Sequence, residues 1–426
     1  MIPANETLPK AEIKKFQERQ LQETLQYLQA HSPFYQKHFR EHRIDVSGIN
    51  YLEDLVQIPP TTKDDLQQYN WDFLCVSPSK IAEYTTTSGT LGKPVTIALT
   101  GKDIRRLAYN ELLSLTCADG APGDLYQLML TLDRQFMAGI AYYEGIRQMG
   151  AGIVRTGPGL PAYQLETMLS VKPTVLIAVP SFLVKIINFA REKGVAMAET
   201  SVRKIVCIGE NIRGEDFQLN ALGKKIRENW DVQLYSTYAS TEMQTAFTEC
   251  AEGAGGHHHP ELMITEVLDE NNQVVRGGDA GELTITSLGI EGMPLLRYKT
   301  GDVVKLYEGN CSCGRTTARV SPLIGRKQQM IKLKGTSFYP HGIFEILHHE
   351  NIADYVVEAF TNELGTDDIT LYLDGDASAQ QRIKTSFQSV LRVLPGIVLT
   401  TPQEIERMQL SDGTRKPRKF IDKRSK

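Results

Sequence analysis

The sequence predicts an α/β protein with a large N-terminal part of several subdomains and a small α+β part at its C-terminal end. Between about residue 84 and residue 240, short β-branched runs alternate with amphipathic stretches of helical period. This alternation is typical of parallel strands joined by helices. From residue 262 a two-residue period with turn residues predicts a β-rich subdomain. The length of 426 residues exceeds what one hydrophobic core usually fills, so at least two domains are expected.

Two helical regions precede the alternating pattern. Residues 10–42 carry apolar side chains at helical spacing and are interrupted at Ser32-Pro33, where the chain is expected to break. Another helix is expected within residues 61–69, because threonine precedes acidic residues in its first turn. The expected buried face of the first region consists of Phe16, Leu21, Leu25 and Leu28.

The expected strands and helices of the alternating region follow in chain order. The helices include residues 181–194 and 217–229. In the C-terminal part, residues 355–363 and 368–376 are expected to pair as strands, with helix between and after them. The strands of the parallel sheet are expected at 95–99, 125–130, 152–157, 173–179, 204–209 and 231–238.

Composition and charge exclude several classes of protein. Apolar residues make up 41% and charged residues 23%, and the formal net charge is -4. A nucleic-acid-binding protein usually carries a basic footprint, which this chain lacks. No apolar run reaches the roughly 18 residues that a membrane span needs, and the N-terminus has no signal-peptide pattern. A cytoplasmic enzyme without nucleic-acid or membrane partners is therefore expected.

The segment YTTTSGTLGKP at 84–94 combines hydroxyl side chains, glycines and a lysine, which together suit a polyphosphate. It is not a Walker A loop, because only two residues separate Gly89 from Gly92 and proline follows Lys93. A polar surface loop is the other interpretation that the composition allows. The hydroxyl groups come from Thr85, Thr86, Thr87, Ser88 and Thr90.

Five ordered segments resemble the signatures of adenylate-forming enzymes, which include acyl-CoA synthetases, luciferases and peptide-synthetase adenylation domains. The N-terminal stretches TLQYLQAHSPFYQKHF and LEDLVQIPPTTKDDL, with GTSFYP and RKFIDKR near the end, narrow the resemblance to the phenylacetate–CoA ligase family. The five segments are TSGTLGKP at 87–94, YASTE at 238–242, GELTIT at 281–286, RYKTGD at 297–302 and GRKQQMIKLKG at 325–335.

This resemblance implies an ATP-dependent ligase that joins an aromatic carboxylic acid, such as phenylacetate, to coenzyme A through an acyl-adenylate. ATP, Mg²⁺ and CoA are the implied cofactors. The implied domains are an N-terminal adenylation domain over 1–325, with a zinc-bearing β-rich subdomain at about 245–320, and a mobile C-terminal domain over 326–426. A homodimer is compatible with the resemblance, although no sequence feature fixes the oligomeric state.

The resemblance also implies roles for individual residues. Glu242 would hold Mg²⁺, and Thr241 would bond the α-phosphate or the acyl carboxylate. Tyr238 would lie near adenine, while Asp302 and Arg326 would reach the ribose. Lys416 would act in adenylation, with Lys419 as the next candidate. The remaining nucleotide-binding residues would be Thr87, Ser88, Gly89, Thr90, Gly92, Lys93, Glu210, Ala239 and Ser240. The sequence departs from the family pattern at Leu91, Arg415, Lys419, Gln328 and Gln329.

Three cysteines and a histidine-rich loop bracket the β-rich subdomain. Cys250, the GGHHHPE segment at 255–261, Cys311 and Cys313 offer the ligands of a tetrahedral Cys₃His zinc site without an open position. The resemblance points to His257 as the ligand, with His259 as the alternative. Reduced surface thiols beside a histidine loop, or a catalytic Cys–His pair, are the competing interpretations.

An apolar slot for the acid is expected in residues 133–150 and in the GENIRG segment at 209–214. Ordinary helix packing is the alternative role for the two tyrosines there. Two other functions compete with the ligase: a nucleotidyltransferase of the coenzyme F390 synthetase type, and a degenerate ATP-binding regulatory protein. The slot residues would be Met137, Ala138, Gly139, Tyr142 and Tyr143.

Overall fold

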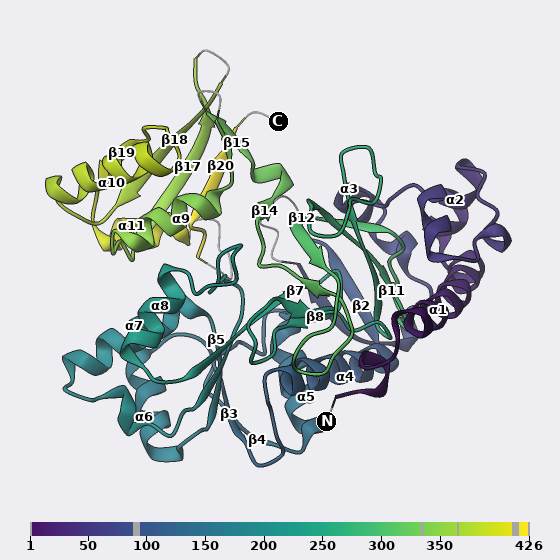
Figure 1. Ribbon diagram of the computed structural model, residues 1–426, viewed down its shortest axis with the longest axis horizontal. Coiled ribbons are helices and arrows are strands. Elements are labelled where there is room, and N and C mark those ends of the chain that lie inside the picture. The colour runs from purple at the N-terminus through teal and green to yellow at the C-terminus, as the bar shows by residue number, and fades with distance from the viewer. Residues whose placement is uncertain (1, 88–93, 334–335, 364–365, 411–416, 425–426) are drawn as a thin grey trace. The chain divides into compact units, whose positions relative to one another are not determined.

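The computed structural model describes residues 2–87, 94–333, 336–363, 366–410 and 417–424 (Figure 1). The chain divides into two compact units, each with a hydrophobic core of its own. The first unit comprises Met1–Leu219 and Gly223–Leu323, and the second comprises Asn220–Leu222 and Ile324–Lys426. Within the described residues, no helix is both long and apolar enough to cross a membrane.

The first unit begins with the helices that the sequence predicts. The Ser32 hydroxyl caps the second helix by accepting a hydrogen bond from the Tyr35 amide, and proline occupies the first helical position, which explains the break. Leu21, Leu25 and Leu28 are buried as expected, whereas the buried side chain before them is that of Gln17 rather than Phe16. The three helices are α1 (Lys10–His31), α2 (Pro33–Glu41) and α3 (Lys63–Gln68).

The strand expected at 95–99 does form, but it does not join the parallel sheet. It forms β2 (Thr96–Thr100) and pairs antiparallel with β1 (Ile81–Thr86) in a two-stranded sheet. The assignment to the parallel sheet was wrong because its partner strand immediately precedes it in the chain, so a hairpin forms locally. The connection of this hairpin contains the TSGTLGKP segment.

The five other expected strands, together with β8, which was not expected, form a six-stranded sheet in the order β4-β3-β5-β6-β7-β8. All neighbouring pairs are parallel except β7 with β8, which is antiparallel. All four residues of the central strand β5 are buried, as expected for a sheet covered on both faces. The strands are β3 (Leu125–Leu128), β4 (Gly152–Arg155), β5 (Val175–Ala178), β6 (Lys204–Cys207), β7 (Gln233–Ser240) and β8 (Thr245–Thr248).

Helices cover this sheet on both sides. Figure 1 shows α4 and α5 on one side of β3 and β5, with α6 and α7 on the other. Thr100 and Asp103 form a reciprocal capping box at the start of α4, so the helix begins directly after β2. The helices are α4 (Gly101–Cys117), α5 (Met137–Met149), α6 (Pro161–Val171), α7 (Pro180–Glu192) and α8 (Ala221–Asn229).

The β-rich part forms an antiparallel sheet in the order β10-β11-β12-β13-β9. The two-residue period in the sequence reflects strands that bury one face against the main core, to which Val267, Leu283 and Ile285 belong. The strands are β9 (Gly256–His257), β10 (Met263–Leu268), β11 (Ala280–Ser287), β12 (Tyr298–Tyr307) and β13 (Arg319–Val320).

The second unit contains a four-stranded sheet in the order β19-β18-β17-β20 and a short hairpin of β15 and β16. The expected strand pair is β17 and β18, which pair antiparallel. The helix expected between them is wrong, because the pairing of Thr361 with Asp367 leaves too few residues for one. The helix expected after the pair does form, and another helix precedes the pair. The elements are β14 (Gly325–Arg326), β15 (Ile331–Leu333), β16 (Thr336–Phe338), α9 (Pro340–His349), β17 (Tyr355–Thr361), β18 (Asp367–Leu373), α10 (Ala377–Val390), β19 (Gly396–Leu399), α11 (Pro402–Gln409) and β20 (Phe420–Lys423).

Candidate functional site

Several predicted site residues follow the carboxyl ends of adjacent parallel strands in the first unit. Glu210 follows β6, and Thr241 and Glu242 follow β7, which pairs in parallel with β6. In open α/β sheets, ligands bind outside this edge of the strands. The sheet therefore positions the YASTE segment where a nucleotide site is expected.

A hydrogen bond between Tyr238 and Asp302 joins two of the predicted segments. The Tyr238 hydroxyl donates to Asp302 Oδ2 at 2.7 Å, across 64 residues of sequence. The Asp302 amide donates to Thr300 Oγ1 at 3.2 Å, within β12 and beside an irregularity in its register with β11. The Tyr238 ring stacks on Phe247 of β8, with 5.9 Å between centroids. The YASTE and RYKTGD segments therefore lie side by side, and Tyr238 orients the Asp302 carboxylate.

Glu242 is nearly buried and lies next to a lysine that sequence analysis did not assign. Lys63, at the start of α3, donates from Nζ to Glu242 Oε1 at 3.3 Å. The same region holds Ser240, whose hydroxyl accepts from the Met243 amide. Carboxylate oxygens are the ligands that a hard cation such as Mg²⁺ prefers. Lys63 belongs to the TTKDDL segment, but the sequence could not show that it pairs with Glu242, which lies 179 residues further along the chain.

Glu210 has a partner on the neighbouring strand–helix connection. Its carboxylate accepts from the Ser181 amide at 2.8 Å and from the Ser181 hydroxyl at 3.0 Å. Ser181 is in the first turn of α7, where unpaired amides attract negative charge. Glu210 therefore fixes the start of α7 beside β6.

Thr87 is buried at the end of the β1–β2 hairpin, where its hydroxyl accepts from the Val95 amide at 3.0 Å. Arg326 lies in β14 of the second unit, and the Lys419 ammonium lies over the Tyr355 ring in that unit. The predicted residues that lie outside the described residues are Ser88, Gly89, Thr90, Gly92, Lys93 and Lys416.

The expected slot residues of α5 contribute mainly to packing. Met137 and Tyr142 are buried in hydrophobic clusters, and a Cβ at Gly139 would come within 2.0 Å of the Thr131 carbonyl oxygen. Tyr143 is half-buried, and the guanidinium groups of Arg147 and Arg155 lie over its ring. The role left open for the two tyrosines, helix packing, agrees with this environment for Tyr142.

The structure brings the three cysteines and one histidine of the predicted metal site together. The ligand atoms of Cys250, His257, Cys311 and Cys313 all lie within 4.8 Å of one another. Cys250 Sγ lies 3.7 Å from Cys311 Sγ, and Cys313 Sγ lies 3.5 Å from His257 Nε2. A tetrahedral zinc ion with bonds of about 2.3 Å to sulfur and about 2.0 Å to nitrogen would separate such pairs by about 3.8 and 3.5 Å. The donor set and its spacing fit zinc.

The protonation preferences of these residues suit a metal site. Burial lowers the pKa of His257 to about 3, so the imidazole is neutral and can act as a ligand. Burial raises the pKa of Cys250 to about 12, so a metal ion would displace its proton. Burial would also raise the pKa of Cys313, but hydrogen bonds from the Arg315 backbone and guanidinium lower it overall.

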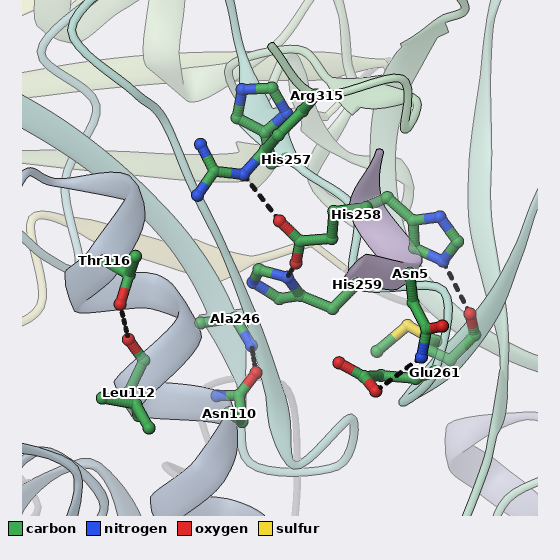
Figure 2. A network of polar contacts seen from close by, with 12 residues as sticks. Asn5, Asn110, Leu112, Thr116, Ala246, His257, His258, His259, Glu261 and Arg315 are labelled. Atoms are coloured by element: carbon green, nitrogen blue, oxygen red, sulfur yellow. Dashed lines mark hydrogen bonds and ion pairs between the residues drawn. The ribbon is translucent and has the colours of Figure 1, made fainter. Parts of the chain in front are cut away.

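The alternative ligand His259 points away from the cysteines. Figure 2 shows its ring bonded to a carboxylate that also accepts from Arg315. This carboxylate belongs to Glu6, and His259 Nδ1 lies 2.5 Å from its Oε1. The fold therefore assigns His257 to the cysteine cluster and His259 to Glu6. Sequence analysis missed Glu6 because it lies about 250 residues before the histidines and carries no local motif.

This fold, with nucleotide-site segments at the carboxyl edge of a parallel sheet, defines an adenylate-forming enzyme. The chain belongs to the AMP-binding enzyme family, whose model matches residues 9–291. It is 30% identical over 350 residues to the phenylacetate-coenzyme A ligase of Thermus thermophilus, covering 81% of this chain and 77% of that protein. The Escherichia coli phenylacetate-coenzyme A ligase is 26% identical over 361 residues, covering 82% and 79%.

Solved structures show the same fold. A 2-hydroxyisobutyryl-CoA ligase in the postadenylation state matches with a TM-score of 0.85 and 24% identity, covering 99% of this chain and 91% of that chain. The anthranilate CoA ligase AuaEII matches with a TM-score of 0.57 and 18% identity, covering 75% and 64%. At these identities the likeness concerns the fold, and the substrates in those names belong to those proteins.

Proposed function

We propose that this protein is an ATP-dependent acid–CoA ligase that acts on an aromatic carboxylic acid, phenylacetate or a close analogue. The bond from Tyr238 to Asp302 carries the proposal, because it brings together the YASTE and RYKTGD segments, to which the resemblance assigns nucleotide binding. The phenylacetate-coenzyme A ligases that this chain resembles over about four fifths of its length support the choice of acid and acceptor.

The reaction would proceed in two steps. The acid carboxylate attacks the α-phosphorus of ATP, which forms an acyl-adenylate and releases pyrophosphate. The CoA thiolate then attacks the acyl carbonyl, which forms the thioester and releases AMP. Because the first step brings two anions together, the site must supply positive charge and hydrogen-bond donors.

In this proposal, the Asp302 carboxylate accepts hydrogen bonds from the ribose hydroxyls. Glu242 holds Mg²⁺, which prefers carboxylate and phosphate oxygens. Lys63 is already paired with Glu242 and would stay beside the phosphates as a second cation. Thr87 and the segment that follows it would hold the phosphates. Lys416 would contact the reacting carboxylate and the α-phosphate, so Lys416→Ala should slow adenylation far more than thioester formation from supplied acyl-adenylate. Equal losses in the two half-reactions would contradict that role.

The proposal includes one structural zinc ion bound by Cys250, His257, Cys311 and Cys313, whose spacing supports four-coordinate binding. When bound, the ion would join the end of β8, strand β9 and the loop at 311–316. All four ligands come from the protein, so the ion would hold the fold and take no part in acyl transfer.

The test is pyrophosphate release with ATP and Mg²⁺ across a panel of aryl, alkyl and 2-hydroxy acids, with and without CoA. We expect acid-dependent pyrophosphate, greatest with phenylacetate-like acids, and multiple turnovers only when CoA is present. Turnover without CoA would favour a nucleotidyltransferase. A response to 2-hydroxy acids alone would contradict the proposed acid, and no response to any acid would refute the ligase.

A further inference from the structure

The carboxylate of Glu6 lies completely buried beside the cysteine–histidine cluster. Glu6 ends the short 3-10 turn η1 (Ala4–Glu6), before α1, and its side chain bridges two partners from the β-rich part. Its Oε1 accepts from His259 Nδ1 at 2.5 Å, and its Oε2 accepts from Arg315 Nε at 2.6 Å (Figure 2). Burial would raise the pKa of Glu6, but His259 and Arg315 lower it to about 2.

Arg315 connects this carboxylate to the metal-binding residues. Its Nη1 donates to Cys313 Sγ at 3.5 Å, and its carbonyl oxygen accepts from the Cys311 amide at 2.8 Å. Arg315 is itself only 3% exposed, so its orientation depends on the groups it contacts. The Glu6 carboxylate therefore fixes a guanidinium that reaches one of the four predicted ligands, Cys313, on a residue whose backbone bonds to a second, Cys311.

Backbone contacts hold the same segment against the loop that carries these cysteines. The Thr316 amide donates to the Glu6 carbonyl at 2.8 Å, and the Thr316 hydroxyl donates to the Leu8 carbonyl at 2.7 Å. Asn5 donates to Glu261, just beyond the three histidines. Residues 5–8 are thus bonded to the loop that carries Cys311 and Cys313 and to the stretch that follows His257.

The charges in this arrangement depend on one another. Three thiolates, a neutral imidazole and Zn²⁺ would carry one net negative charge, which the Arg315 guanidinium faces. Without Glu6, Arg315 and His259 would lose their buried acceptor, and breaking a buried ion pair on one side is strongly unfavourable. Groups that orient metal ligands from outside typically change metal affinity by 10–100-fold when they are removed.

We propose that Glu6 is a positioning residue of the Cys₃His site, so that zinc binding and the docking of residues 2–9 are thermodynamically coupled. This inference rests on the zinc ion in the proposed function. Zinc stabilises the docked segment, and the docked segment stabilises zinc by an equal free energy, because coupling between two binding events is reciprocal.

The first experiment measures zinc affinity by competition with a chromophoric chelator. Glu6→Gln preserves the side-chain shape but removes the charge and places an amide group against Arg315 or His259. We expect its zinc affinity to fall by about 10–100-fold. Glu53→Gln is the matched control, because Glu53 forms an exposed ion pair with Lys14 of α1, and it should bind zinc like the unaltered protein. Equal zinc affinity for Glu6→Gln and the unaltered protein would overturn the proposal.

The second experiment uses only the unaltered full chain, so it does not depend on how the variant folds. Hydrogen exchange is measured with zinc bound and after zinc is removed by a chelator. We expect residues 2–9 and the Thr316 amide to lose protection, while α10 stays unchanged. Unchanged protection of residues 2–9 would overturn the coupling. If the unaltered protein binds no zinc, both the zinc ion of the proposed function and the coupling are refuted. If it binds zinc but residues 2–9 keep their protection, only the coupling is refuted.

Discussion

Substitution of Asp302 tests the proposed nucleotide site by removing a single negative charge. Asparagine has the same shape but is a weaker acceptor for two ribose hydroxyls, and a hydrogen bond to a charged group contributes about 1.5–3 kcal/mol. We therefore expect Asp302→Asn to raise KM for ATP by roughly 10–100-fold, measured as pyrophosphate release against ATP concentration. Tyr238→Phe removes only the neutral donor to Asp302 and should cost roughly 2–10-fold.

The comparison of these two variants separates a nucleotide contact from an internal one. If Asp302 served only to hold Tyr238, Asp302→Asn would at most weaken the bond that Tyr238→Phe removes, and it would raise KM no more than Tyr238→Phe does. An effect of Asp302→Asn no larger than that of Tyr238→Phe would therefore contradict the assigned role of Asp302. Thermal unfolding of both variants checks that the differences arise at the site.

Glu111 of α4 should make stability depend on pH. Burial raises its pKa to about 8, and its Oε1 accepts from the Asn110 amide group, while its Oε2 has no hydrogen-bond partner among the residues that the structure describes. The native state therefore keeps a proton that the unfolded chain, with a pKa near 4.5, releases. Because the native state binds more protons between these two values, stability falls as pH rises, by at most about 1.4 kcal/mol per pH unit.

Glu111→Gln should remove this dependence. Between about pH 5.5 and pH 7.5, the unaltered protein should lose roughly 2–3 kcal/mol more unfolding free energy than the variant. Urea unfolding at the two pH values measures the difference, and comparison with the variant cancels the contribution of histidines that titrate elsewhere. Parallel pH profiles for the two proteins would show that Glu111 is ionised when folded.

The contact between α4 and α5 depends on a glycine. A Cβ at Gly145 of α5 would lie 2.4 Å from the Glu111 Cβ and 3.1 Å from its carbonyl carbon. Although alanine favours a helix, we expect Gly145→Ala to destabilise the protein by about 1–3 kcal/mol, because the helices must move apart. Urea unfolding provides the measurement. Gly123→Ala is the control, since a Cβ there meets nothing within 4 Å, and equal effects of the two substitutions would contradict this account.

The sequence predicted elements best where local signals decide them. Ser32-Pro33 and Thr62 set helix starts through capping, and these assignments are confirmed. The β-branched runs located five of the six expected parallel strands, whereas the run at 95–99 pairs antiparallel. The periodicity failed where a distant partner decides. Gln17 is buried instead of Phe16, because its amide group donates to the carbonyls of Pro260 and Met263, about 245 residues away.

The candidate site shows the same limit. Motif order predicted that Tyr238, Glu242 and Asp302 share one site, and the structure brings Tyr238 and Asp302 into contact. Their supporting partners could not be predicted, since Lys63 and Glu6 become neighbours only through the packing of distant segments. Spacing alone also could not choose between His257 and His259. The strand pairing of His257 with Arg319 in β9 and β13 determines which imidazole faces the cysteines.

The whole molecule combines the first unit, which carries the predicted nucleotide and zinc residues up to residue 323, with a second unit that carries Arg326 and Lys419. The hydrophobic clusters of the two units share no residues. Such independence is expected of a chain whose length exceeds a single core. It also predicts that the second unit can fold when it is separated from the first.

We expect residues 324–426 to fold alone, because their four-stranded sheet and its core lie within this segment. The isolated segment should show a cooperative thermal transition by circular dichroism.

Phe387→Ala, at a fully buried position of α10, should lower the unfolding free energy of the segment by about 3–5 kcal/mol, and so abolish the transition or sharply lower its midpoint temperature. Val390→Ala, on the same helix but 64% exposed, should change it by less than about 0.5 kcal/mol. A segment without a cooperative transition, or one equally sensitive to both substitutions, would show that its core is incomplete without the rest of the chain.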